Sequence, residues 1–130
     1  MHLDKLYKIL LVDDDQDILD VVTINIKSEI IAKLLIHESC NAEDAMNLAS
    51  KNTYDLVITD YKLPKLNGDE LIRYLRQATS NKSCPILFIS GFFTELELPQ
   101  GDESFNKIIF IDKPFEITEL INHIKTQLKI

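Results

Sequence analysis

The chain has 130 residues, of which 45% are hydrophobic and 27% charged, a mix typical of one soluble globular domain. Its formal net charge of −7 argues against binding to a nucleic-acid backbone or to anionic lipid, since both attract clustered lysine and arginine. Two cysteines are too few for a disulfide framework, and no apolar run approaches the roughly 20 residues that span a bilayer. The opening residues also lack the apolar stretch of a signal peptide. We therefore expect one domain over residues 1–130, in the cytoplasm and without membrane or nucleic-acid contacts.

Five short apolar runs are spread along the chain. Each is too short for a helix and lacks alternating polar residues, which indicates strands buried on both faces. The predicted strands are Ile9–Val12, Leu34–Ile36, Leu56–Ile58, Ile86–Ile89 and Ile108–Ile111.

The segment after the first run predicts a helix, although its β-branched residues favour strands. Asp15 or Asp17 suits the helix N-terminus, where a carboxylate can accept backbone N–H groups. The apolar positions that share one helical face there are Ile18, Val21, Val22 and Ile26.

The later connecting segments also have helical spacing. The last is the clearest, because its apolar residues fall at i, i+3, i+4, i+7 and i+11. A segment containing Phe92 and Leu98 predicts one or two turns, since Pro99 and Gly101 end any helix there. The apolar positions of the other predicted helices are Ala42, Ala45, Met46 and Ala49; Leu71, Ile72, Leu75 and Ala78; and Ile117, Leu120, Ile121, Ile124 and Leu128.

Strand and helix thus alternate five times, which predicts an α/β fold with a parallel sheet covered by helices on both faces. Because crossovers between parallel strands are right-handed, few topologies remain. We expect a flavodoxin-like, doubly wound, five-stranded parallel sheet in the order 2-1-3-4-5.

Polar side chains follow four of the predicted strands at the point where each strand ends. The carboxyl ends of parallel strands lie at one edge of the sheet, and open α/β sheets bind ligands at that edge. We therefore expect these side chains to share one pocket. They are Asp13 and Asp14 after the first strand, Asp60 after the third, Ser90 after the fourth and Lys113 after the fifth.

The chemistry of this pocket follows from its donors. Carboxylates packed together repel one another unless a cation lies between them. Since the candidate ligands are all oxygens, the cation should be Mg²⁺, or Mn²⁺ in its place. Asp60 is the central carboxylate and would attack a phosphorus atom. The metal, the ammonium of Lys113 and the hydroxyl of Ser90 would share the charge of the transferring oxygens.

In order and position, these motifs resemble those of a two-component response-regulator receiver domain over nearly the full length of the chain. Taken singly they are weak signals, whereas together, each at a predicted strand end, they are strong. They are Asp13-Asp14, the stretch Val57–Pro64 around Asp60, the pair Asn67-Gly68, Ser90, and Lys113-Pro114-Phe115.

The resemblance implies that Asp60 accepts a phosphoryl group from a sensor histidine kinase or a phosphotransfer protein. It further implies that Asp14 and Asp60 bind Mg²⁺ directly with the backbone carbonyl of Lys62, while Asp13 acts partly through water. Lys113 would pair with the phosphoryl oxygen, and its peptide bond to Pro114 would be cis. The domain would assist its own phosphorylation and would not be an enzyme.

The resemblance also implies a switch. Ser90 would move toward the phosphoryl group and Phe110 would change its packing with it. The face made by the short helix near residue 92, the strand Ile108–Ile111 and the helix from Ile117 would then change. A downstream protein, an output domain or a second copy of the chain would read that change.

The sequence departs from the family pattern at three places. Ser90 stands where Thr is commoner, Gly91-Phe92 follows where a small residue usually leads, and the fourth helix is short. Lys62 and Phe92 are expected to flank the pocket mouth. If Phe92 shields the acyl phosphate from water, Phe92→Ala should speed dephosphorylation.

Other readings of the same residues remain open. The acidic run could serve only as a helix N-terminus, although an EF-hand is excluded because Ile18 stands where Gly is required. A phosphohydrolase with an aspartyl-phosphate nucleophile would need an acid where Lys62 stands, and a cap for which the chain has no spare length. A domain of this fold that is not phosphorylated would leave the acidic pair and Lys113 without a role.

Overall fold

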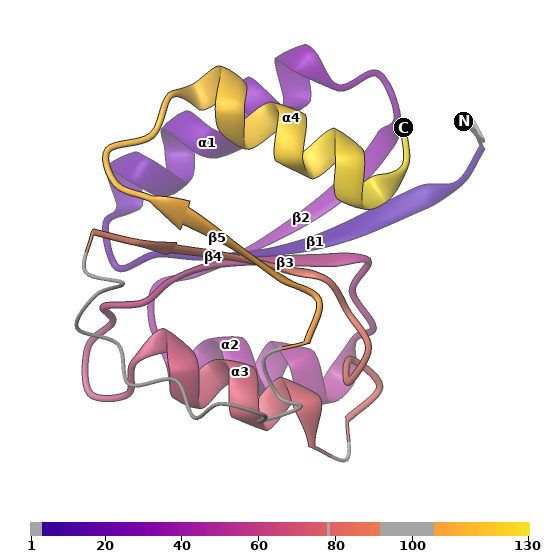
Figure 1. Ribbon diagram of the computed structural model, residues 1–130. Helices are drawn as coiled ribbons and strands as arrows, with labels where there is room; N and C mark the ends of the chain where they lie inside the picture. Colours follow the sequence, from indigo (N-terminus) through magenta and orange to yellow (C-terminus); the bar gives the residue numbers. More distant parts are fainter. Residues whose placement is uncertain (1–3, 78, 92–105) are drawn as a thin grey trace.

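The computed structural model describes residues 4–77, 79–91 and 106–130. Its centre is a five-stranded parallel sheet in the order β2-β1-β3-β4-β5, which confirms the predicted fold (Figure 1). The strands are longer than the apolar runs because flanking residues continue the ladders. They are β1 (Leu6–Val12), β2 (Lys33–Ser39), β3 (Leu56–Asp60), β4 (Ile86–Ser90) and β5 (Ile108–Asp112).

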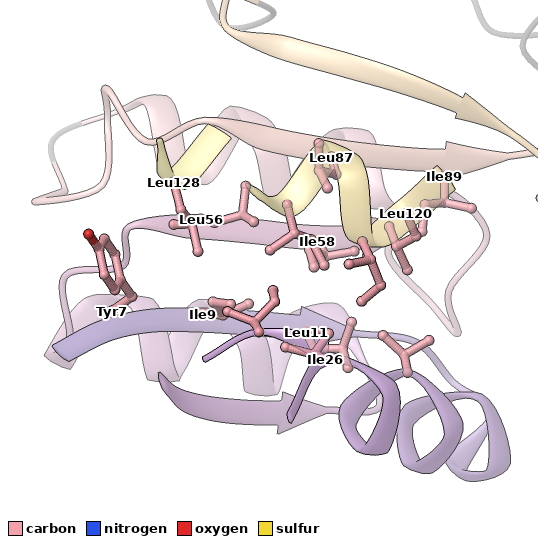
Figure 2. Packing of buried hydrophobic residues seen from close by; sticks show 14 of the residues in the cluster. Tyr7, Ile9, Leu11, Ile26, Leu56, Ile58, Leu87, Ile89, Leu120 and Leu128 are labelled. Atoms are coloured by element: carbon pink, nitrogen blue, oxygen red, sulfur yellow. The ribbon is translucent and has the colours of Figure 1, made fainter. Parts of the chain in front are cut away.

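Helices cover both faces of the sheet, so the structure has three layers (Figure 1). One apolar core lies under α1 and α4, where Ile9, Ile58 and Leu120 are fully buried (Figure 2). A second core lies under α2 and α3 around Phe88, which is also fully buried. The helices are α1 (Gln16–Glu29), α2 (Ala42–Lys51), α3 (Gly68–Arg76) and α4 (Ile117–Leu128).

Helix α1 forms where β-branched residues had favoured a strand. Asp15 caps it by accepting the backbone N–H of Asp17 at 2.9 Å. The prediction of its buried face was partly wrong, because Ile18 and Val21 are 41% and 53% exposed. The side chains that pack on the sheet are instead Leu19, Val22 and Ile26.

The two edge strands also depart from the sequence prediction. Strands β1, β3 and β4 are almost entirely buried, but Leu35 in β2 and Phe110 in β5 are exposed. An edge strand has a neighbour on one side only, and the helices cover the middle of the sheet more completely than its margins. An uninterrupted apolar run therefore indicated a strand correctly, but not burial on both faces.

The predicted fourth helix around Phe92–Leu98 lies outside the described residues, as do Ala78 and the expectation for Phe92. Among the residues that the structure describes, no helix is both long and apolar enough to cross a membrane.

Candidate functional site

The predicted site residues meet at the carboxyl edge of the sheet. Asp13 directly follows β1, Asp60 and Ser90 are the last residues of β3 and β4, and Lys113 directly follows β5. The register aligns these ends, since Asp60 pairs with Ile89 and Ser90 pairs with Asp112. Asp13, Asp60 and Ser90 are buried there, whereas Asp14 and Lys113 are exposed.

Three carboxylates form a cluster at this edge. Asp13, Asp14 and Asp60 each offer an oxygen within 4.8 Å of the others. Burial raises the pKa of Asp13 from 3.8 to about 6; the N–H of Asp15 lowers it in part, and the charge of Asp60 raises it. Negative charge in this cluster is therefore costly when no cation is bound.

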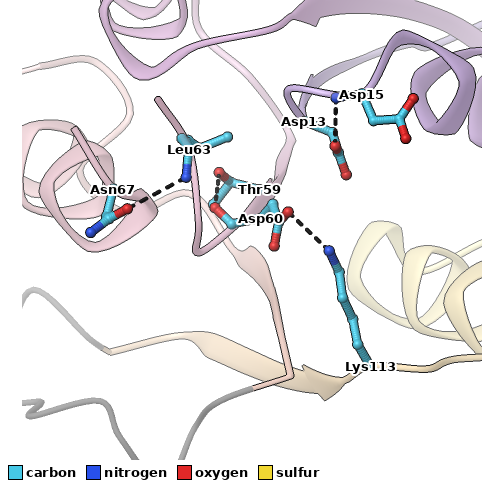
Figure 3. A network of polar contacts seen from close by, with 7 residues as sticks. All are labelled: Asp13, Asp15, Thr59, Asp60, Leu63, Asn67 and Lys113. Atoms are coloured by element: carbon cyan, nitrogen blue, oxygen red, sulfur yellow. Dashed lines mark hydrogen bonds and ion pairs between the residues drawn. The ribbon is translucent and has the colours of Figure 1, made fainter. Parts of the chain in front are cut away.

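Lys113 supplies positive charge next to the carboxylate cluster. Its ammonium lies 2.9 Å from Oδ2 of Asp60 and converges with the Asp13 and Asp60 carboxylates (Figure 3). The backbone N–H of Lys113 bonds to the carbonyl of Ser90 at 2.9 Å, which joins β4 to the segment after β5. The Lys113–Pro114 peptide bond is cis, as the family resemblance implied.

The cluster opens into a cleft of about 520 Å³. One wall is the loop Lys62–Pro64, and the rest of the lining comes from Asp14, Asp60, Ser90, Gly91 and Lys113. Lys62 thus borders the cleft, as expected from the sequence. A phosphoryl group that entered here would meet a carboxylate, a hydroxyl and an ammonium within one space.

The loop between β3 and α3 is held by interactions that the sequence reasoning did not predict. The N–H of Gly68 bonds to the carbonyl of Tyr61 at 2.6 Å and closes the loop. Asn67 stands at the N-cap position of α3, yet its Oδ1 accepts the N–H of Leu63 at 3.4 Å (Figure 3). The Asn-Gly pair had indicated a turn, but not that its side chain would bind back to the loop.

Gly68 has no room for a side chain. A Cβ atom on Gly68 would collide with the carbonyl oxygen of Asp60 and would lie 2.9 Å from Cε1 of Phe88. The N-terminus of α3 therefore lies directly against the backbone of Asp60.

A second, apolar groove of about 670 Å³ lies beside the cleft and shares Gly91 and Lys113 with it. Ile18 and Val21 of α1 form one side, and Phe115 lies in the lining as well. This groove escaped the sequence analysis because Ile18 and Val21 were predicted to face the core.

The structure thus brings Asp13, Asp14, Asp60, Ser90 and Lys113 together. Phe110 does not line the cleft; it lies on the edge strand β5 with 43% of its surface exposed.

Comparisons with known proteins agree with this arrangement. Residues 9–125 match the sequence model of the response regulator receiver domain. The chain is 30% identical over 122 residues to the response regulator ArlR of Staphylococcus saprophyticus, covering 94% of this chain and 52% of that protein. It is 31% identical over 122 residues to the regulatory protein VanR of Enterococcus faecium, covering 94% and 50%. The chain therefore spans about half the length of the curated relatives it matches.

A solved structure supports the same likeness. The receiver domain of the Francisella response regulator 1452 superposes with a TM-score of 0.78 at 25% identity, covering 95% of this chain and 97% of that one.

Proposed function

The chain belongs to the response regulator receiver domain family, whose members act in two-component phosphorelay signalling, and from this premise we propose that Asp60 is its phosphoacceptor. The observation that carries the proposal is the contact between Lys113 and Asp60 at 2.9 Å, inside a cluster of three carboxylates that faces an open cleft. The proposed donor is a phosphohistidine of a sensor histidine kinase or a phosphotransfer protein.

In the proposed reaction a carboxylate oxygen of Asp60 forms a bond to phosphorus while the phosphorus–nitrogen bond of the phosphohistidine breaks. The leaving imidazole keeps the electron pair and takes up a proton. Lys113 and Ser90 line the cleft, where the ammonium and the hydroxyl would stabilise the negative oxygens of the transferring group. The protein mainly positions the reactants, so it assists its own modification without turning over a substrate.

A protein donor suits the surroundings of the cleft. The apolar groove with exposed Ile18 and Val21 borders the site and offers a surface to a partner's side chains. This feature favours transfer from a macromolecule, whereas a phosphohydrolase would use an enclosed pocket for a small substrate.

The site also fits Mg²⁺, with Mn²⁺ as a substitute. Its donors are carboxylate oxygens gathered within 4.8 Å, which is the chemistry that a hard divalent cation prefers. We assign Asp14 and Asp60 as direct ligands with the backbone carbonyl of Lys62, and Asp13 as a ligand acting partly through water. When bound, the cation would neutralise charge on the carboxylates and on the phosphoryl oxygens.

The proposed output is a change in protein contacts. Ser90 would respond to the phosphoryl group, and Phe110 on β5 would change its packing. Of the expected output face, β5 and α4 lie in the described part of the chain. A downstream protein, an output domain or a second copy of the chain would bind this face.

We expect residues 1–130 to form the receiver domain and to act in the cytoplasm. We also expect that this domain itself binds neither nucleic acid nor a membrane.

Incubation with acetyl phosphate and Mg²⁺ tests the proposal. Intact-mass measurement should find one added phosphoryl group in the wild type and none in Asp60→Asn. Asp112→Asn is the matched control, because it removes an exposed carboxylate at the same sheet edge and should leave the adduct unchanged. An unmodified wild type that binds Mg²⁺ would refute phosphoacceptance. Repeated turnover of a phosphomonoester would favour a phosphohydrolase.

A further inference from the structure

Three aromatic rings form a row of contacts from Tyr61, the residue after Asp60, to the edge strand β5. The ring centroids of Tyr61 and Phe88 are 5.9 Å apart, and those of Phe88 and Phe110 are 6.0 Å apart. Both pairs are tilted, within the range in which aromatic rings attract one another. We call Tyr61, Phe88 and Phe110 the aromatic column.

The sheet register fixes the middle and outer members of the column. Phe88 in β4 pairs with Thr59 in β3 and with Phe110 in β5. Paired residues of parallel strands lie on the same face, so these three side chains form one row on the face of the sheet that Phe88 occupies. Thr59 in turn donates its hydroxyl to the carbonyl of Asp60 at 3.0 Å.

At its inner end the column is packed tightly against the site. Tyr61 directly follows Asp60, and its N–H bonds to the carbonyl of Ile89 at 2.8 Å. Gly68 fills the space between the Asp60 carbonyl and the Phe88 ring so closely that no Cβ fits there. Close-packed interiors have little free volume, so a shift of the backbone at Asp60 must displace its neighbours.

At its outer end the column reaches the surface. Phe88 is fully buried, whereas 43% of Phe110 is exposed on the edge strand. A displacement of the buried ring would therefore change the position of a large apolar side chain that a partner can contact.

We propose that the aromatic column carries the state of Asp60 to the outer surface of β5, with Phe88 as the positioning residue between them. This inference rests on the proposed function and adds to it a physical route between the phosphoacceptor and Phe110. Coupling of this kind is reciprocal, so a change at Phe88 also alters the affinity of the site for its ligand.

The experiment uses beryllofluoride with Mg²⁺ as a mimic of the acyl phosphate and follows Phe110 by fluorine NMR. All six phenylalanines are replaced by 4-fluorophenylalanine, and the Phe110 signal is assigned by its loss in Phe110→Leu. The signal should shift on addition of beryllofluoride to the wild type. In Phe88→Leu most of that shift should disappear, and the beryllofluoride Kd should change by roughly 5-fold or more, within the usual range of coupling between sites.

Leu87→Val is the matched control. Leu87 is fully buried in the same strand, but it faces the opposite core, so its truncation lowers stability without touching the column. It should keep both the shift and the Kd. Tyr61→Leu, a change at a half-buried position, provides a second test if Phe88→Leu fails to fold.

The outcomes separate the two proposals. Absence of beryllofluoride binding in the wild type would contradict phosphoacceptance at Asp60. Binding that depends on Asp60, together with a full Phe110 shift in both column variants, would overturn the column alone. If the shift of the Phe110 signal is lost equally in Leu87→Val, Phe88 acts only as an ordinary core residue and the proposal is wrong.

Discussion

Asn81 and Asp60 are both buried polar residues, but their side chains have different surroundings. Asn81 is 1% exposed, and its side chain forms hydrogen bonds with backbone groups of three other residues. Its Oδ1 accepts the N–H of Tyr54 at 2.7 Å, and its Nδ2 donates to the carbonyls of Ala49 at 3.0 Å and Asn52 at 2.8 Å. Asp60 is 6% exposed and pairs with Lys113 while facing two further carboxylates.

The contrast separates a structural polar group from a functional one. Buried polar groups are normally satisfied by hydrogen bonds, as Asn81 is, and this fixes the connections around α2, β3 and β4. Three carboxylates beside one ammonium leave excess negative charge at the other edge of the sheet. That excess negative charge favours a bound cation. Without a cation, the repulsion between the carboxylates lowers the stability of the folded protein at this edge.

The largest expected effect is at Asn81. Replacement by Leu leaves one N–H and two carbonyls without partners, each costing about 1–3 kcal/mol, so the free energy of unfolding should fall by about 4 kcal/mol. Urea denaturation measures this loss. Mg²⁺ affinity, measured by calorimetry under conditions in which the variant is folded, should not change. A loss below about 1 kcal/mol would contradict the structural role.

The next effect is a pH dependence of the free energy of unfolding, which comes from Asp13. Because its pKa is raised to about 6, the folded protein keeps a proton that the unfolded chain loses near pH 4. This contribution to stability is full below about pH 4 and is lost as the pH rises through 6. It amounts to about 3 kcal/mol, at roughly 1.4 kcal/mol for each pH unit of the shift.

Asp13→Asn tests that pH dependence in metal-free buffer. Asparagine keeps an oxygen to accept the N–H of Asp15 but carries no charge. The variant should be more stable than the wild type at pH 7, and the two should converge near pH 4. Urea midpoints between pH 4 and 8 give the difference. Parallel curves would show that Asp13 has an ordinary pKa.

A smaller effect is expected at Gly68, where the cleft meets α3. Gly68→Ala should cost about 2 kcal/mol, because the new Cβ would be too close to both the Asp60 carbonyl and the Phe88 ring. Gly91→Ala is the control, since a Cβ there meets Lys113 at an ordinary 3.7 Å. Thermal unfolding compares the two variants. Equal stability of both would mean that the contact at Gly68 relaxes freely.

The smallest effect distinguishes two asparagines at helix N-caps. Asn41 accepts the N–H of Asp44 at 2.7 Å, so Asn41→Ala should cost about 1 kcal/mol without changing Mg²⁺ affinity. Asn67 bonds instead to Leu63 in the wall of the cleft, so Asn67→Ala should weaken Mg²⁺ binding as well. Calorimetric titration with Mg²⁺ separates the two. Identical affinities would show that the Asn67 bond does not shape the site.

The sequence predicted the fold well because its signals were local. Apolar runs such as Ile86–Ile89 mark strands, and a parallel sheet brings the ends of its strands to one edge. That reasoning predicted the meeting of Asp13, Asp60 and Lys113 without any knowledge of the loops. The apolar face of helix α4 was also predicted, since the positions spaced between Ile117 and Leu128 all lie in the observed helix.

What the sequence did not reveal depends on tertiary contacts. Val21 fits a buried helical face by spacing, yet α1 is rotated so that Leu19 packs on the sheet. The bond between Asn67 and Leu63 and the tilted ring contact between Phe88 and Phe110 join residues whose approach is set by loop closure and strand register. Neither leaves a periodic signal in the chain.

The most direct test of the account identifies the residue that carries the phosphoryl group. After treatment with acetyl phosphate and Mg²⁺, borohydride reduction converts an aspartyl phosphate to homoserine, and peptide mass spectrometry locates it. The account predicts homoserine at position 60. Homoserine at position 13 or 14, or a stable phosphate on another residue, would contradict it.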